Sequence, residues 1–258
     1  MFNLSSMIAD PVFYALAVPA VLMVGISKGG FAGGIGLIAV PMMALVIPPV
    51  QAAGIMLPIL IAMDLMSAWA YRTKWDKTNL FILLPGAVIG IAFGTATAHF
   101  VSDDAVRLII GSVAVLFTLH YWFRGGEARA ATGPNRIKGT LWGTVGGYTS
   151  FVAHAGSPPF QVYMLPQKLD KTIYVGTSVM FFTVVNWVKL PAYAWLGQLA
   201  PGNLMTSAVL LPLAPIGVLL GIWLHNIIPE KPFYRVIYTM IFIVGLKLLW
   251  DGASGAVL

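Results

Sequence analysis

Most of the polar residues that could bind a ligand lie in two glycine-rich interruptions of otherwise apolar sequence. The first break covers residues 27–36 and the second covers 150–159, about 122 positions later. Glycine allows close approaches that side chains prevent, and a helix that restarts after a break directs free amides and the positive end of its dipole into the gap. Such a gap suits an anion.

The first break combines a hydroxyl group, a positive charge and four glycines. Lys28 could be the counter-charge of an anionic ligand, or its ammonium could extend from a helix end to the membrane surface. The glycines could expose amides to the ligand, or they could let helices cross closely, because they form two Gly-xxx-Gly patterns. The predicted ligand-binding residues of this break are Ser27, Lys28, Gly29, Gly30, Gly33 and Gly34.

The second break supplies hydroxyl, imidazole and amide groups. Pro158 and Pro159 lack amide donors and prevent a continuous helix there. His154 could donate to a ligand oxygen or carry a proton, although a lone histidine is usually structural. The predicted ligand-binding residues of this break are Tyr148, Ser150, His154, Gly156, Ser157 and Gln161.

Asp64 lies deep in a long apolar segment, where an acidic residue must be neutral, paired or functional. The residue 122 positions later is Asn186, which has a side chain of the same shape. We predict either a symmetric hydrogen-bonding role for these two residues or a coupling-proton site, with Asp64, His154 and Asn186 as candidates. Lys189 is nearer the end of its segment, where its ammonium could reach the membrane surface.

The composition identifies an integral membrane protein. Of the 258 residues, 59% are hydrophobic and 9% are charged, with a mean hydropathy of +0.86. Lipid offers the backbone no hydrogen-bond partners, so the spans must be helices or a closed barrel, and the long apolar runs without alternation exclude the barrel. The net charge of +6 is concentrated in short loops, which indicates orientation in the membrane rather than nucleic-acid binding.

Several kinds of site are absent from the sequence. There is no cysteine, and no histidine cluster accompanies the methionines, so we expect neither a metal nor another cofactor. No Gly-x-x-x-x-Gly-Lys-Ser/Thr motif is present. No pair of close carboxylates or activated nucleophile indicates an enzyme.

Polar loops separate ten apolar segments. The four that flank the breaks are shorter than the about 20 residues needed to cross a membrane, so we expect half-helices or tilted hairpin arms there, and the other six are long enough to span. The predicted segments are roughly 11–27, 35–47, 50–71, 79–99, 104–123, 138–153, 157–165, 172–196, 203–228 and 233–250.

The second half of the chain repeats the first. Besides the breaks, Gly54 matches Gly176, and Leu84-Pro85 matches Leu211-Pro212. The basic loops predict a cytoplasmic side, and one hairpin plus three spans ends opposite its start, so the second unit is inverted. We predict an all-α membrane protein of two inverted repeats. Its repeats cover residues 1–124 and 138–258, and a polar cytoplasmic linker covers 125–137.

The run from Lys28 to Pro41, with Gly146-Gly147 and Gly156-Ser157-Pro158-Pro159, resembles the sulfite exporter TauE/SafE family, also called the 4-toluenesulfonate uptake permease family. The resemblance covers nearly the whole chain. It implies a carrier in the bacterial inner membrane for sulfite, sulfonates or related small sulfur-containing anions.

We therefore expect a secondary transporter that moves a small organosulfur anion across the bacterial inner membrane by alternating access. Its expected partners are this anion and the lipid bilayer, and nothing in the sequence indicates an oligomeric state. The alternatives are an anion channel, a carrier of a small carboxylate and a membrane-embedded enzyme.

Overall fold

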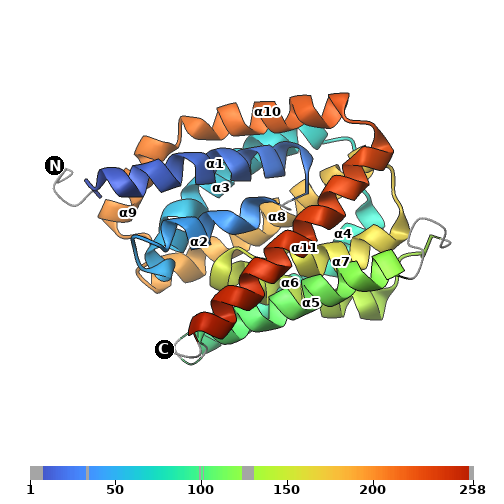
Figure 1. Ribbon diagram of the computed structural model, residues 1–258, viewed down its shortest axis with the longest axis horizontal. Coiled ribbons are helices and arrows are strands. Elements are labelled where there is room, and N and C mark those ends of the chain that lie inside the picture. The colour runs from blue at the N-terminus through green and yellow to red at the C-terminus, as the bar shows by residue number, and fades with distance from the viewer. Residues whose placement is uncertain (1–7, 33–34, 99, 101, 124–130, 256–258) are drawn as a thin grey trace.

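The computed structural model describes residues 8–32, 35–98, 100, 102–123 and 131–255, and these residues form helices joined by loops, without a strand (Figure 1). The first half contains α1 (Pro11–Gly30), η2 (Ile35–Ile38), α2 (Ala39–Met43), α3 (Pro49–Tyr71), α4 (Lys77–Thr97) and α5 (Asp103–Phe123). The second half contains α6 (Arg136–Ala153), α7 (Ser157–Met164), η3 (Leu165–Gln167), α8 (Lys171–Trp195), α9 (Pro201–Leu210), α10 (Leu213–Ile227) and α11 (Glu230–Gly255).

Four described helices are long and apolar enough to cross a membrane, namely α1, α3, α4 and α8. α9 and α10 together would make a fifth span, although they are bent by 48° at their junction. α5 and α11 are also long, at 21 and 26 residues. The predicted all-helical membrane architecture is confirmed, whereas the opposite orientation of the two halves stays a prediction.

Two of the predicted segments differ from the structure. The segment 11–27 was expected to be too short to span, but α1 continues to Gly30 and has 20 residues. Its last glycines remain helical because they pack against α10. The segment 203–228 was expected to be one span, but Pro212 lacks an amide donor and separates α9 from α10.

Side-chain caps mark the start of α1 and α8, two of the helices that carry the site. Asp10 accepts a hydrogen bond from the Val12 amide at the start of α1, at 2.8 Å. Asp170 accepts from the amides of Thr172 and Ile173 at the start of α8, at 2.8 and 3.2 Å. These bonds satisfy amides that have no partner within the helix.

Two helix pairs, α1 with α10 and α4 with α6, pack through glycines that bring the backbones together. Figure 1 shows α10 lying along α1. A Cβ atom added at Gly29 of α1 would lie 2.2 Å from the carbonyl oxygen of Val218, and one added at Gly90 of α4 would lie 2.0 Å from that of Thr144. Small residues allow this contact between membrane helices.

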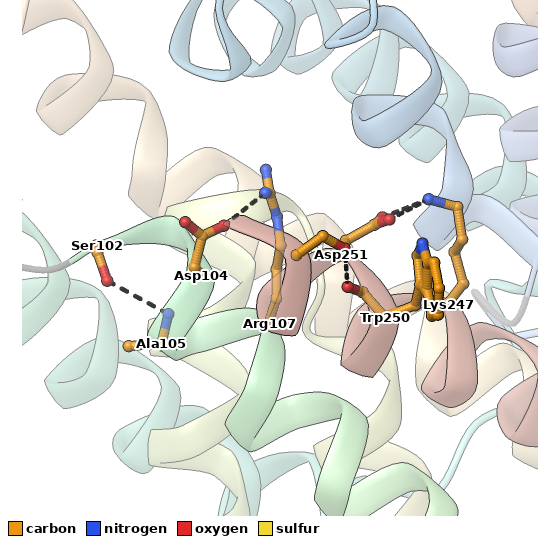
Figure 2. A network of polar contacts seen from close by, with 8 residues as sticks. Ser102, Asp104, Ala105, Arg107, Lys247, Trp250 and Asp251 are labelled. Carbon is orange, nitrogen blue, oxygen red and sulfur yellow. Dashed lines mark hydrogen bonds and ion pairs between the residues drawn. The ribbon is translucent and has the colours of Figure 1, made fainter. Parts of the chain in front are cut away.

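α5 and α11 form a third pair, and charged residues lie at one end of it. Asp104 Oδ1 is 3.0 Å from Arg107 Nη1, and Lys247 pairs with Asp251 (Figure 2). Gly255 leaves room for the carboxylate of Asp104, because a Cβ atom there would lie 2.5 Å from it. Acidic and basic groups are therefore equal in number in this cluster.

The glycine contact between α4 and α6 can be tested by substitution. Gly90→Leu places side-chain atoms against the backbone of Thr144, which cannot rotate away, so the helices must separate. We expect a loss of about 1–3 kcal/mol in stability, measured as a lower melting temperature in detergent. Gly133→Leu is the matched control, because a Cβ atom there meets nothing within 4 Å. Equal melting temperatures for the two variants would contradict the packing.

Candidate functional site

A cavity lies between the two breaks and is lined by residues from both halves of the chain. The space open to the centre of a water-sized sphere is about 50 Å³, whereas one water needs about 10–15 Å³. The cavity therefore has room for a small ion. Its polar lining residues are Ser27, Lys28 and Asp64 from the first half and Ser150, His154, Ser157, Ser178 and Asn186 from the second.

Asp64 contacts both halves of the chain. Its Oδ1 atom forms an ion pair with Lys28 Nζ, and its Oδ2 atom accepts a hydrogen bond from Asn186 Nδ2 at 2.6 Å. The side chains of Asp64 and Lys28 are 1% and 12% exposed, so the pair lies in the interior. Lys28 therefore reaches inward to a carboxylate and not to the membrane surface. The residues predicted to share a hydrogen-bonding role, Asp64 and Asn186, contact each other directly.

Two tyrosines at matching sequence positions make matching contacts. Tyr71 Oη donates to the carbonyl oxygen of Gly29 at 2.7 Å, which joins α3 to α1. Tyr193 Oη donates to the carbonyl oxygen of Phe151 at 2.7 Å, which joins α8 to α6. The members of both pairs are 42 residues apart in sequence. Each break is therefore tied to the long helix that follows it.

His154 follows the end of α6 and has both ring nitrogens engaged. Its backbone has φ of 51°, in the left-handed region, as does the matching residue Ala32 in the first break. Nε2 lies 3.0 Å from the carbonyl oxygen of Ala53, and Nδ1 lies 2.8 Å from Lys189 Nζ. The ring lines the cavity, but it can contact a ligand oxygen only by giving up one of these partners.

Lys189 is a site residue whose role the sequence analysis missed. The expectation that its ammonium reaches the membrane surface is wrong, because the side chain is 0% exposed. Nζ donates to the carbonyl oxygen and Oγ of Ser150 at 3.0 and 3.1 Å, and it contacts His154 Nδ1. The signal was present in the sequence: Asn186 and Lys189 are three residues apart and so share one face of a helix.

The other predicted polar residues differ in their relation to the cavity. Ser27 and Ser157 line it, and Ser27 Oγ has no hydrogen-bond partner among the described residues. Gln161 is buried beside the first break, where its Nε2 atom donates to Ala32 O at 3.4 Å. Tyr148 is not among the lining residues, and its ring packs against Phe93 at 5.7 Å between centroids.

The predicted glycines that the structure describes, Gly29, Gly30 and Gly156, pack helices together and are not among the residues that line the cavity. Gly29 and Gly30 contact α10, where an added Cβ atom would lie 2.2 Å from a carbonyl oxygen in each case. Gly156 contacts α6, because a Cβ atom there would lie 2.8 Å from the Gly146 carbonyl oxygen. Of the two roles left open by the sequence, these contacts favour close helix packing. Gly33 and Gly34 lie outside the described residues.

The chemistry of the cluster suits an anion. It combines two lysines, one aspartate and several hydroxyl groups, and hydrogen bonds from charged donors are the strong ones for an oxyanion. Among the residues that the structure describes, no three histidine or acidic side chains come together to hold a metal ion.

Comparison with known proteins gives one result. The family model described as Sulfite exporter TauE/SafE matches residues 17–248. No curated protein and no solved structure gives a significant match to this chain.

The ion pair predicts a compensating effect between two substitutions. Lys28→Met leaves Asp64 buried without its cation, which we expect to lower the stability by about 3 kcal/mol. Adding Asp64→Asn removes the unpaired charge and should restore most of the lost stability. The measurement is the melting temperature of each variant in detergent at neutral pH. If the double variant melts no higher than Lys28→Met alone, the pair does not stabilise the fold.

Proposed function

Because the chain belongs to the sulfite exporter TauE/SafE family, whose model matches residues 17–248, we propose that it carries a small sulfur oxyanion across the bacterial inner membrane as a secondary transporter. The observation that carries this proposal is the buried cluster of Lys28, Asp64, Asn186 and Lys189 beside a cavity between the two breaks. Buried ionisable groups inside a membrane protein are costly and usually serve transport.

The size and the donors of the cavity favour a substrate of few atoms. Its small volume fits sulfite or a short sulfonate better than an aromatic sulfonate. Lys28 can provide a charged donor to a substrate oxygen, and Ser27 and Ser157 can provide hydroxyl donors. Ser27 Oγ is buried, and no partner for it is found in the described part of the chain, so a substrate oxygen would satisfy it.

In this proposal, the substrate and the carboxylate of Asp64 compete for Lys28. Asp64 Oδ1 already occupies the position beside Nζ that an oxyanion would take. Protonation of Asp64 removes its negative charge and frees Lys28, so a proton on Asp64 can accompany an anion into the site. Asp64 is the stronger candidate for the coupling proton, because His154 uses both ring nitrogens in other contacts and Asn186 does not titrate.

Alternating access would come from movement of each broken hairpin together with its long helix. Tyr71 holds α1 to α3 and Tyr193 holds α6 to α8, so each group can move as a body. Two such bodies of opposite orientation, meeting at Asp64 and Asn186, would expose the cavity to one side of the membrane at a time.

Counterflow in proteoliposomes tests transport and separates the alternatives. We expect sulfite inside the vesicles to accelerate uptake of labelled sulfite, and the rate to saturate with concentration. A channel would give flux without saturation or exchange, and exchange of acetate but not of sulfite would indicate a carboxylate carrier. Sulfite should also raise the melting temperature, because a ligand of the folded state stabilises it. Conversion of added substrate to a product would indicate an enzyme instead.

Asp64→Asn tests the coupling role. The variant keeps the hydrogen-bonding shape of the side chain but cannot take up a proton, so we expect sulfite exchange to continue while accumulation driven by a pH gradient is lost. Both are measured in the same proteoliposomes. Asn186→Ala is the matched control, since it removes the hydrogen bond to Asp64 but leaves the carboxylate. Accumulation that persists in Asp64→Asn would exclude this residue as the coupling site.

A further inference from the structure

Lys189 is a fully buried lysine whose hydrogen bonds go to neutral groups. None of the ion pairs among the described residues includes it. Its hydrogen bonds at 3.0, 3.1 and 2.8 Å go to the carbonyl oxygen and Oγ of Ser150 and to the imidazole of His154. A buried charge held only by neutral groups is unfavourable unless another ion joins it. An anion bound close to Lys189 would offset this cost.

Three ion pairs lie within the described part of the chain. Lys28 is paired with Asp64, and the cluster at the end of α5 and α11 contains two acids and two bases in two ion pairs (Figure 2). Lys189 differs from these groups in both its complete burial and its lack of an acidic partner.

Lys189 lies directly behind the cavity wall. It does not line the cavity itself, but both residues that it contacts, Ser150 and His154, do. The Ala53 carbonyl oxygen only accepts hydrogen bonds, so its contact assigns the ring proton of His154 to Nε2, and Nδ1 accepts from Lys189. The imidazole is therefore neutral. In this low-dielectric interior, the charge of Lys189 acts strongly on an ion in the cavity.

With Lys189 protonated, the site has one net positive charge, from two lysines and one aspartate. We propose that Lys189 sets the total charge of what the site binds, counted as the anion plus any proton. The site takes up one net negative charge, either as a monovalent anion alone or as a divalent anion with one proton on Asp64. The inference rests on the proposed function. The titratable groups around Asp64 are Lys28 of α1, His154 after α6 and Lys189 of α8. His225 of α10 contacts Tyr71 at the end of α3 instead.

The test is to count the protons taken up on binding two anions of fixed charge, methanesulfonate and sulfate. Calorimetry of the full chain in detergent, in two buffers of different ionisation enthalpy, gives this count. The wild-type protein should bind monovalent methanesulfonate with no proton and divalent sulfate with one. Lys189→Met should take up one proton with methanesulfonate. It should bind this anion about tenfold more weakly, which corresponds to a loss of ~1.4 kcal/mol in binding free energy.

A charge-matched double variant distinguishes the effect of the Lys189 charge on binding from a role of Lys189 in holding the fold. Lys189→Met with Asp64→Asn removes one charge of each sign, so the site again has one positive charge, on Lys28. We expect this variant to bind methanesulfonate without proton uptake and more tightly than Lys189→Met does. If Lys189 served only to hold the fold, the double variant would be at least as impaired as Lys189→Met.

The outcomes separate this inference from the proposed function. If the wild-type protein binds neither anion, the inference and the proposed sulfur-oxyanion function fail together. If it binds both but takes up the same number of protons with each, the charge rule alone is wrong. The wild-type comparison needs no variant, so it tests the rule even if Lys189→Met does not fold.

Discussion

The buried ion pair between Lys28 and Asp64 is the interaction on which the site depends. Neither charge is stable alone in the interior of a membrane protein, so each requires the other at close range. The pair brings the end of α1 to the middle of α3, and the second oxygen of the carboxylate accepts a hydrogen bond from Asn186 of α8. One carboxylate therefore joins the two halves of the chain at the cavity. In the proposed function, an entering anion competes with this carboxylate for Lys28.

Close glycine contacts make the scaffold around this pair rigid. α1 lies against α10 and α4 against α6 with backbones touching, and the tyrosines Tyr71 and Tyr193 tie each break to its long helix. The polar residues of the breaks are thus held by packed helices rather than by free loops. Such a scaffold can keep donors in position while larger bodies move, as a carrier requires.

The sequence predicted the membrane class, most helices and the central pair of residues. Asp64 and Asn186 were found by their spacing of 122, because a duplicated chain places matching residues in matching environments. The roles of Gly29 and Gly30 could not be predicted, because their spacing serves both ligand binding and helix packing and only the neighbour α10 decides between them. The burial of Lys189 was misread because its distance from the end of a segment says nothing of the helices around it.

The sequence by itself determined that this protein is a helical membrane protein, and it predicted two similar halves and an anion site between them. Lipid leaves long apolar runs few options other than helices, and duplication is visible as spacing. Only the tertiary structure decided which lysine is neutralised. Lys28 meets Asp64, whereas Lys189 meets Ser150 and His154, because helices far apart in sequence set these neighbours. The net positive charge that we propose for the site rests on that arrangement.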